Sequence, residues 1–199
     1  MKSLPVTAKT LARAIKILKK GGVIAHPADT CFGLAGDMMN PKVPETIRII
    51  KGRNALKPMS IMLPMGFKKD ISNYAIVDEF SQKLIDKLLP GPVTILLPKG
   101  PLIPRHYFPE TELVGIRIPD DALTQMLLTG FGGALITTSA NKAGSDLCHT
   151  HEEVLRSVDA FPDMIFEGSI PPESKASTVI LPKNGKVEVI REGAFQFLI

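Results

Sequence analysis

The chain has 199 residues, of which 44% are hydrophobic and 22% charged, and its formal net charge of +4 and ordinary composition predict one globular domain over residues 1–199. A mildly basic chain suits an anionic ligand or a nucleic acid but requires neither. No apolar run approaches the roughly 20 residues of a membrane span and no apolar leader follows Met1, so we expect a cytoplasmic protein without a membrane partner.

The first part of the chain combines helical and extended patterns. Apolar residues recur at helical spacing from Thr7 to Lys20, and Gly21-Gly22 ends that predicted helix. Val23-Ile24-Ala25 predicts a short buried strand. In chain order, the next segments predict a loop or turn at 28–34, a helix at 43–51, a strand at 61–63 and a helix at 77–89.

Strands predominate in the second part of the chain. The patterns predict strands at 93–97 and 113–118, a helix at 119–128, a strand at 134–137, a helix at 151–158, and strands at 164–166, 178–181 and 187–190. Asn184-Gly185 predicts a hairpin between the last two strands. Thr150, with Glu153 three residues later, predicts a capping box. Because strict strand–helix alternation is missing, the order predicts an α/β fold with a mixed sheet and helices packed on it.

A cluster of cations follows the second predicted helix. Lys51, Arg53 and Lys57 fall within seven residues, where Gly52 and Pro58 favour an irregular segment over a continued helix. An arginine with neighbouring lysines is the usual grip on phosphate groups. The alternative is a solvated cluster at a helix end, where cations are favoured in any case.

Hydroxyl and amide groups follow a predicted apolar strand at Ser139 and Asn141. Side chains two residues apart face the same way in extended structure, so this pair can hydrogen-bond a ligand at the end of the sheet. The alternative is a plain Ser-Asn turn. Thr30, after the first strand, and Ser177, before a late one, offer hydroxyls in the same manner or only cap their turns.

Arg117 is the only charge in residues 114–119, a segment otherwise fit for burial, so its guanidinium requires an anionic partner. That partner is either a structural Asp or Glu or the carboxylate of a ligand. Arg191 raises the same question after the last predicted strand, where a structural role that reaches solvent is the stronger alternative.

The sequence gives little support for a metal site or for a covalent nucleophile. Cys148, His149 and His151 are metal-ligand types in close order, but no second Cys/His pair stands at zinc-site spacing, so we expect no metal site. The sequence lacks a Walker loop, a Gly-x-Gly-x-x-Gly loop and a Gly-x-Ser-x-Gly elbow. Cys31 and Cys148 are expected to be free thiols. Scattered basic and polar side chains must then hold any nucleotide.

Taken together, several stretches resemble the YrdC family, the threonylcarbamoyl-AMP synthases, and they cover nearly the whole sequence. In order, they are Gly21-Gly22-Val23-Ile24-Ala25-His26-Pro27-Ala28-Asp29-Thr30 with Gly33-Leu34; Lys51-Gly52-Arg53 with Lys57-Pro58; Pro90-Gly91-Pro92-Val93-Thr94; Val114-Gly115-Ile116-Arg117-Ile118-Pro119; Thr138-Ser139-Ala140-Asn141; Ser177-Thr178-Val179; and Ile190-Arg191-Glu192-Gly193-Ala194. The Lys-x-Arg pair followed by Ser-x-Asn makes the match specific.

The resemblance implies a fold and a reaction. The implied fold is a twisted sheet with helices around a concave basic cleft. The implied enzyme is a nucleotidyltransferase that converts L-threonine, bicarbonate and ATP into threonylcarbamoyl-AMP and pyrophosphate, with Mg²⁺ bound alongside ATP. Its product feeds threonylcarbamoyladenosine synthesis in tRNA through downstream transfer proteins.

The resemblance also implies a role for each candidate residue. Lys51 and Arg53 are implied to be the catalytic pair that stabilises the charge building on pyrophosphate. The implied ATP ligands are Arg53, Lys57, Asn141, Thr150 and Arg191. The implied threonine ligands are Thr30, Arg117, Ser139 and Ser177, with Arg117 on the carboxylate.

Two positions differ from the family pattern, and one other function stays open. Ala28 stands where the family usually has Thr, and His26 where it usually has an aromatic residue, which affects the threonine pocket in detail. The competing hypothesis is a double-stranded-RNA-binding protein in ribosome or RNA maturation, because a basic cleft also fits RNA phosphates. RNA binding weakens steeply with ionic strength and ATP binding less, so salt dependence separates the two.

Overall fold

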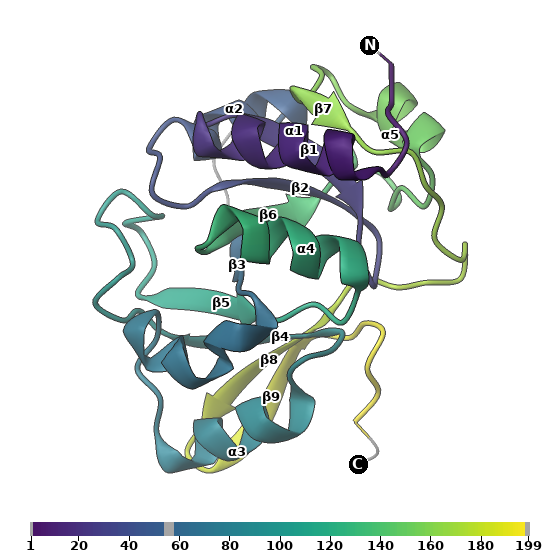
Figure 1. Cartoon of the computed structure of the whole chain (residues 1–199). Helices are drawn as coiled ribbons and strands as arrows, with labels where there is room; N and C mark the ends of the chain where they lie inside the picture. The colour runs from purple at the N-terminus through teal and green to yellow at the C-terminus, as the bar shows by residue number, and fades with distance from the viewer. Residues whose placement is uncertain (1, 54–57, 198–199) are drawn as a thin grey trace.

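The computed structural model describes residues 2–53 and 58–197, and one mixed sheet runs through this part of the chain (Figure 1). The strands are β1 (Val23–Pro27), β2 (Phe32–Asp37), β3 (Ser60–Met62), β4 (Val93–Pro98), β5 (Leu113–Arg117), β6 (Leu135–Ser139), β7 (Met164–Ile165), β8 (Thr178–Lys183) and β9 (Lys186–Arg191). Within the described residues their order is β7-β1-β2-β6-β3-β5-β4-β8-β9, with parallel and antiparallel neighbours. The predicted mixed α/β fold is confirmed, and the single domain over the whole chain stays a prediction.

The helices are α1 (Ala8–Lys19), α2 (Val43–Ile50), α3 (Glu79–Leu88), α4 (Ala122–Phe131) and α5 (His151–Ser157), together with the 3₁₀ helix η1 (Met65–Asn73). Apolar periodicity predicts each α-helix to within a few residues, but it does not predict η1. The capping box at the start of α5 is confirmed, because Thr150 Oγ1 accepts a bond from the Glu153 backbone N–H at 3.2 Å and the Glu153 carboxylate accepts one from the Thr150 N–H.

The strand β2 contradicts the predicted loop or turn over residues 28–34. Phe32 already starts a strand that pairs antiparallel with both β1 and β6. This strand has two glycines and no β-branched residue, so the usual strand signal is missing. Close packing explains one of the glycines, since a Cβ on Gly36 would lie 2.5 Å from Val43 Cγ1 at the start of α2. Two strand neighbours and a close helix therefore override a weak local preference.

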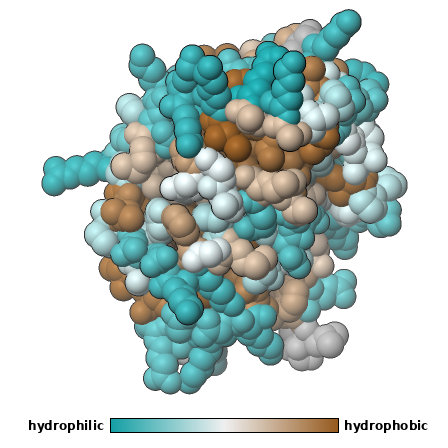
Figure 2. Space-filling model, viewed as in Figure 1, coloured by the Kyte–Doolittle hydropathy of each residue, from teal (hydrophilic) through white to brown (hydrophobic). Residues whose placement is uncertain are grey.

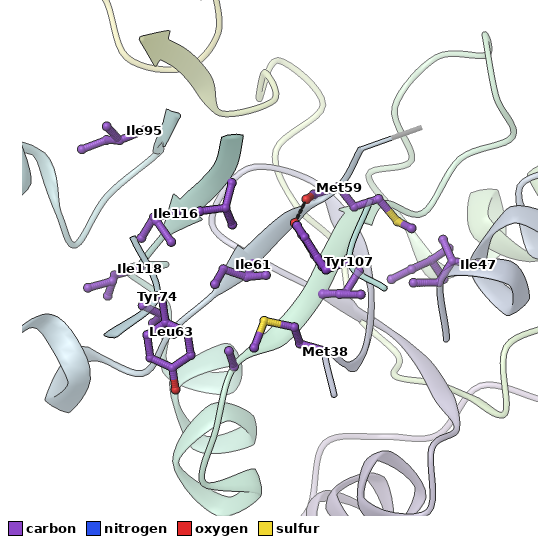
Figure 3. Close-up of a cluster of buried hydrophobic side chains, with 14 of the residues drawn as sticks. Met38, Ile47, Met59, Ile61, Leu63, Tyr74, Ile95, Tyr107, Ile116 and Ile118 are labelled. Atoms are coloured by element: carbon purple, nitrogen blue, oxygen red, sulfur yellow. Dashed lines mark hydrogen bonds between the residues drawn. The ribbon is translucent and has the colours of Figure 1, made fainter. Parts of the chain in front are cut away.

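Alternate strand residues build two hydrophobic clusters, one on each face of the sheet. One cluster packs against α1 and α4, which lie in front of the strands in Figure 1, through residues such as Leu18, Ile24 and Leu128. The other cluster packs against α2, α3 and α5 and includes the residues drawn in Figure 3. Both faces of the central strands are thus covered, and functional side chains must emerge where the strands end.

Tyr107 anchors the long loop that joins β4 to β5. Its side chain is 1% exposed, and its hydroxyl donates a hydrogen bond to the Met59 carbonyl (Figure 3). The ring packs edge-on against Phe108, with 4.9 Å between the two ring centroids. The loop is thereby tied to the residue that precedes β3.

The predicted hairpin at Asn184-Gly185 joins β8 to β9. Both turn residues have positive φ, 52° and 70°, as a tight two-residue hairpin requires. The register places Val179 of β8 opposite Arg191 of β9. The hairpin therefore returns Arg191 to the start of β8.

The surface is mostly hydrophilic in the view of Figure 2, especially over α1 at the top, with smaller apolar areas between. α1 exposes Lys9, Arg13 and Lys16 and contains no acidic residue. Among the described helices, none has both the length and the apolar character to cross a bilayer.

We expect Tyr107→Phe to lower the free energy of unfolding by about 1–2 kcal/mol, because the buried Met59 carbonyl loses its donor. Urea unfolding followed by circular dichroism measures the change. Tyr74→Phe is the matched control, since Tyr74 is 7% exposed and its hydroxyl makes no hydrogen bond to the described residues. Equal losses in the two variants would contradict a specific role for the Tyr107–Met59 bond.

Candidate functional site

A cavity of about 260 Å³ opens where several strands of the sheet begin or end. Its described lining contains three arginines, Arg53, Arg117 and Arg191, and no carboxylate. Hydroxyl groups make up much of the remaining lining, from Thr30, Ser60, Thr94, Thr137, Thr138, Ser139 and Ser177. The cavity therefore offers cations and hydrogen-bond donors to a polar, anionic ligand.

Cross-strand neighbours form one wall of this cavity. Gly33 of β2 lies opposite Ser139 of β6, and Met62 of β3 pairs with Arg117 of β5. Residues opposite one another share a face of the sheet. This face is the one covered by α1 and α4, because Met62 also belongs to their hydrophobic cluster. Strand register, not sequence proximity, brings these residues together.

Arg117, the last residue of β5, forms a nearly buried ion pair. Its Nη2 donates to the Asp29 carboxylate and, at 2.8 Å, to Thr30 Oγ1, with 9% of the Arg117 side chain and 11% of the Asp29 side chain exposed. Burial raises the pKa of Asp29, and the Arg117 charge opposes that rise. Nε is buried without a partner among the described residues, and Nη1 makes no hydrogen bond to them, so Nη1 is left for a ligand in the cavity that Arg117 lines. The structural carboxylate that the sequence left open is therefore Asp29, and one end of the guanidinium stays available.

The two positions that differ from the family pattern lie in different places. Ala28 lines the cavity. His26 is 1% exposed, and its Nδ1 lies 3.0 Å from the Pro27 carbonyl oxygen and 3.3 Å from Thr124 Oγ1 of α4. Burial lowers the pKa of His26, while the charge of Asp121 opposes this. His26 is therefore a buried neutral group that packs toward α4.

Lys51 points its ammonium at the end of β6 and is 1% exposed. Nζ donates to the carbonyl oxygens of Ser139 and Asn141, the latter at 2.6 Å, and lies 3.4 Å from Asn141 Oδ1. The Ala143 N–H donates back to the Lys51 carbonyl at 3.0 Å. Burial lowers the pKa of Lys51 to about 7, and the charge of Arg53 acts in the same direction. Lys51 therefore fixes the turn after β6 from behind the cavity.

The amide of Asn141 organises the same turn. Its Oδ1 accepts a bond from Ser139 Oγ at 2.5 Å, and its Nδ2 donates to the carbonyls of Lys142 and Ser145 at 3.1 and 2.6 Å. Ser139 lines the cavity, whereas Asn141 lies outside the described lining. In this arrangement the Ser-x-Asn pair is a rigid turn that holds one hydroxyl at the cavity.

Gly52 turns the chain from α2 toward Arg53. Its φ is +57°, and a Cβ there would lie 1.9 Å from Asp159 Oδ2, so a larger residue would strain the backbone and displace that side chain. Arg48 Nη1 donates to the Arg53 carbonyl at 2.6 Å and holds the backbone in place. Burial lowers the pKa of Arg53, whose Nε is buried without a partner among the described residues. Arg53 is thus the cation of the Lys-x-Arg pair that reaches the cavity.

Arg191 holds Ser177 at the opposite wall. Its Nη2 donates to the Ser177 carbonyl at 2.7 Å and to Ser177 Oγ at 3.1 Å, and its Nε donates to the same carbonyl at 3.2 Å. Ser177 Oγ also shares a bond of 2.8 Å with Thr94 Oγ1. Arg191 as a whole residue is exposed, and partial desolvation of its guanidinium lowers its pKa. These contacts give Arg191 a structural partner in addition to its place in the lining.

The residues predicted from the sequence fall into three groups. Those that line the cavity are Thr30, Arg53, Arg117, Ser139, Ser177 and Arg191. Lys51 and Asn141 support the turn behind it, and Thr150 caps α5. Lys57 lies outside the described residues. The roles of all these residues in binding and catalysis, and the concave basic cleft, stay predictions.

The sequence patterns indicate no role for Thr94, Ser60 or Thr137, which also line the cavity. All three lie on strands, where a buried threonine or serine looks like an ordinary core residue. Thr94 closes the stretch Pro90–Thr94, and that stretch is the one signal from which it could have been found.

Among the described residues, no three or more His, Cys, Asp or Glu side chains gather as metal ligands would. Both cysteines are free, as expected, and both are buried. His149 Nε2 lies 2.9 Å from the Ser174 carbonyl oxygen, and His151 Nδ1 lies 3.1 Å from that of Gly168. These contacts hold the two histidines to neighbouring loops.

Comparison with known proteins relates this chain to a family. A family model for Sua5, YciO and YrdC proteins, described as telomere recombination, matches residues 16–193. A Bos taurus protein named threonylcarbamoyl-AMP synthase is 34% identical over 194 residues, which are 93% of this chain and 68% of that protein.

Solved structures share the fold. E. coli YciO superposes with a TM-score of 0.84 and 26% identity, covering 98% of this chain and 93% of that chain. Sua5 of P. abyssi in complex with L-threonine superposes with a TM-score of 0.85 and 22% identity, covering 96% of this chain. This chain spans 56% of the P. abyssi chain, so that likeness concerns the fold.

We expect Lys51→Met to change the pH dependence of stability. Folded Lys51 releases its proton above about pH 7, whereas an unfolded lysine keeps it up to the ordinary value of 10.5. Between these values the unfolded chain binds more protons, so this group makes the wild-type free energy of unfolding rise with pH, while below about pH 7 its contribution is flat.

Urea unfolding from about pH 6 to about pH 9 measures the wild-type value minus the variant value, which should grow with pH. Lys9→Met, at an exposed position of α1, is the control. A difference that is the same at every pH would show that folded Lys51 keeps its ordinary pKa.

Proposed function

Because the chain belongs to the Sua5, YciO and YrdC family, we propose that it is a threonylcarbamoyl-AMP synthase. The relative named for this activity in Bos taurus supports the proposal. The observation that carries it is the cavity, where Arg117 and hydroxyl groups suited to an amino acid lie together with Arg53, a cation suited to phosphate.

The reaction has two bond-forming steps. The amine of L-threonine attacks the carbon of bicarbonate, and loss of water leaves a carbamate. A carbamate oxygen then attacks the α-phosphorus of ATP, and the bond between that phosphorus and the bridging oxygen breaks as pyrophosphate leaves. In this proposal the enzyme is a nucleotidyltransferase that needs no covalent protein nucleophile. Its catalysis then depends on positioning the substrates and on stabilising the charge of the leaving pyrophosphate.

The amino-acid end of the cavity is assigned to Arg117 and its neighbours. Asp29 and Thr30 hold Nη2, which leaves Nη1 directed to the substrate carboxylate. An arginine fixed in this way loses little freedom on binding, which favours recognition of a carboxylate. Ser139 and Ser177 supply further hydroxyls to threonine.

The nucleotide end is assigned to Arg53, with Lys57, Asn141, Thr150 and Arg191 as further ATP ligands. Arg53 is the member of this group that combines a place in the lining with a side chain free of hydrogen bonds to the described residues. Its charge would stabilise pyrophosphate as it leaves. Lys51 would support catalysis by fixing the Ser139 turn against which the nucleotide packs.

Mg²⁺ is proposed to arrive with ATP. Protein sites usually hold this ion through one or two carboxylates together with substrate phosphates. The described lining of the cavity supplies hydroxyls and arginines but no carboxylate, so these residues do not form a resident magnesium site. The phosphates of ATP would carry the ion, and the roles assigned to the residues above do not depend on it.

The proposed partners follow from the reaction. L-Threonine, bicarbonate and ATP are the substrates, and the product is consumed by proteins that transfer the threonylcarbamoyl group to tRNA in the cytoplasm. The P. abyssi Sua5 structure contains L-threonine, which supports threonine as the amino acid. No observation on the described residues favours the double-stranded-RNA alternative over this reading.

The direct test is release of pyrophosphate from ATP by the purified chain. We expect release only when L-threonine and bicarbonate are both present, because the attacking carbamate contains atoms of both. A coupled pyrophosphatase assay measures it, with omission of each substrate as the control. Release that ignores threonine would overturn the proposed function.

We expect Arg53→Ala to lower the rate of pyrophosphate release by at least about tenfold with little change in melting temperature. The side chain faces the cavity and makes no hydrogen bond to the described residues, so its loss leaves the fold intact. Arg13→Ala, at an exposed position of α1, is the matched control. An active Arg53→Ala protein with a lowered melting temperature would instead make the residue structural.

A further inference from the structure

Thr94, the second residue of β4, lines the cavity and is 2% exposed. β4 and β5 are antiparallel with Ile95 opposite Ile116, so the same register sets Thr94 opposite Arg117. Directly opposite residues have Cβ atoms about 5 Å apart on one face of the sheet. Gly115 agrees with this placement, since a Cβ on it would lie 3.0 Å from Thr94 Cγ2. Thr94 is thus the neighbour of the arginine assigned to the substrate carboxylate.

The hydroxyls of Thr94 and Ser177 leave one proton without an acceptor. They share a single hydrogen bond of 2.8 Å, which uses one of their two hydroxyl protons. Either hydroxyl can be the donor in this bond. Ser177 Oγ accepts from Arg191 Nη2 at 3.1 Å, and this contact favours donation from Ser177 to Thr94, in a chain in which each bond polarises the next. Among the described residues no other acceptor bonds Thr94 Oγ1. In that direction, the proton of Thr94 Oγ1 is free for an acceptor in the cavity.

The other hydroxyls near Arg117 are differently engaged. Ser139 Oγ donates its proton to Asn141 Oδ1 at 2.5 Å. Thr30 Oγ1 accepts from Arg117 Nη2 at 2.8 Å and helps to hold the guanidinium. Thr94 differs from both because its oxygen lies at the end of a hydrogen-bond chain that starts at Arg191.

We propose that Thr94 is a specificity-determining residue that hydrogen-bonds the side-chain hydroxyl of the amino-acid substrate, with Ser177 and Arg191 orienting it. In L-threonine the hydroxyl oxygen is separated from the carboxylate carbon by only two carbons. A carboxylate on Arg117 therefore places that hydroxyl within reach of the directly opposite residue. This assignment rests on the proposed function, and it adds a residue that recognises the side chain of the amino-acid substrate.

The test compares binding of L-threonine and L-valine, which replaces the hydroxyl by a methyl group, using isothermal titration calorimetry. The wild type should prefer threonine, since a site built around a hydroxyl rejects an analogue that lacks it. Thr94→Val keeps the shape of the side chain and removes its donor. We expect this variant to weaken threonine binding by roughly three- to tenfold while valine binding stays the same or improves.

Two further variants separate recognition from folding. Thr94→Ser keeps the hydroxyl and should keep the preference for threonine. Thr124→Val removes another fully buried threonine hydroxyl, which bonds His26, and should leave the preference unchanged. If Thr94→Val has a melting temperature well below that of Thr124→Val, Thr94→Ala replaces it in the same comparison.

An unchanged threonine-to-valine ratio in the variant that lacks the Thr94 hydroxyl would overturn the inference while leaving the proposed function intact. A wild-type protein that binds neither amino acid and releases no pyrophosphate would overturn the proposed function and the inference with it. Equal loss of threonine and valine binding would reduce Thr94 to a structural residue and would also overturn the inference.

Discussion

The buried ammonium of Lys51 is the contact on which the cavity depends. It joins the end of α2 to the turn after β6 by donating to the carbonyls of Ser139 and Asn141. Carbonyls that turn away from a sheet need donors, and a buried cation that has such acceptors costs less than an unpaired one. With that turn fixed, Ser139 lies at the cavity and Gly52 can direct Arg53 to it. One side chain thus positions parts of two walls without lining either.

Strand register then supplies the remaining walls. Arg117 and Thr94 lie opposite one another on β5 and β4, and Ser177 reaches the same place from the start of β8. Asp29, just after β1, neutralises part of the arginine charge from outside the lining. The cavity therefore combines a fixed carboxylate anchor with hydroxyl groups whose directions are set by neighbouring bonds.

The sequence predicts the α-helices and most strands because their periodicity and caps are local signals. It misses β2, whose strand character comes from two neighbours and from the approach of α2 to Gly36. The sequence predicts Arg117 as a site residue but does not identify the carboxylate that pairs with it. That pairing with Asp29 depends on how the ends of β1 and β5 meet. The sequence does not predict Thr94 as a site residue for a similar reason, since only cross-strand register distinguishes it from a core threonine.

Three of the contacts that build the cavity join residues that are distant in sequence. Arg117 and Asp29 are 88 residues apart, Lys51 and Ser139 are 88 apart, and Thr94 and Ser177 are 83 apart. Each contact requires closure of a long loop, and such contacts become favourable only when most of the sheet has been ordered. A chain in which these strands have not yet paired therefore has no ligand cavity. Any ligand that needs all these walls binds only the completed fold. Such a ligand therefore raises the free energy of unfolding, in addition to being a substrate.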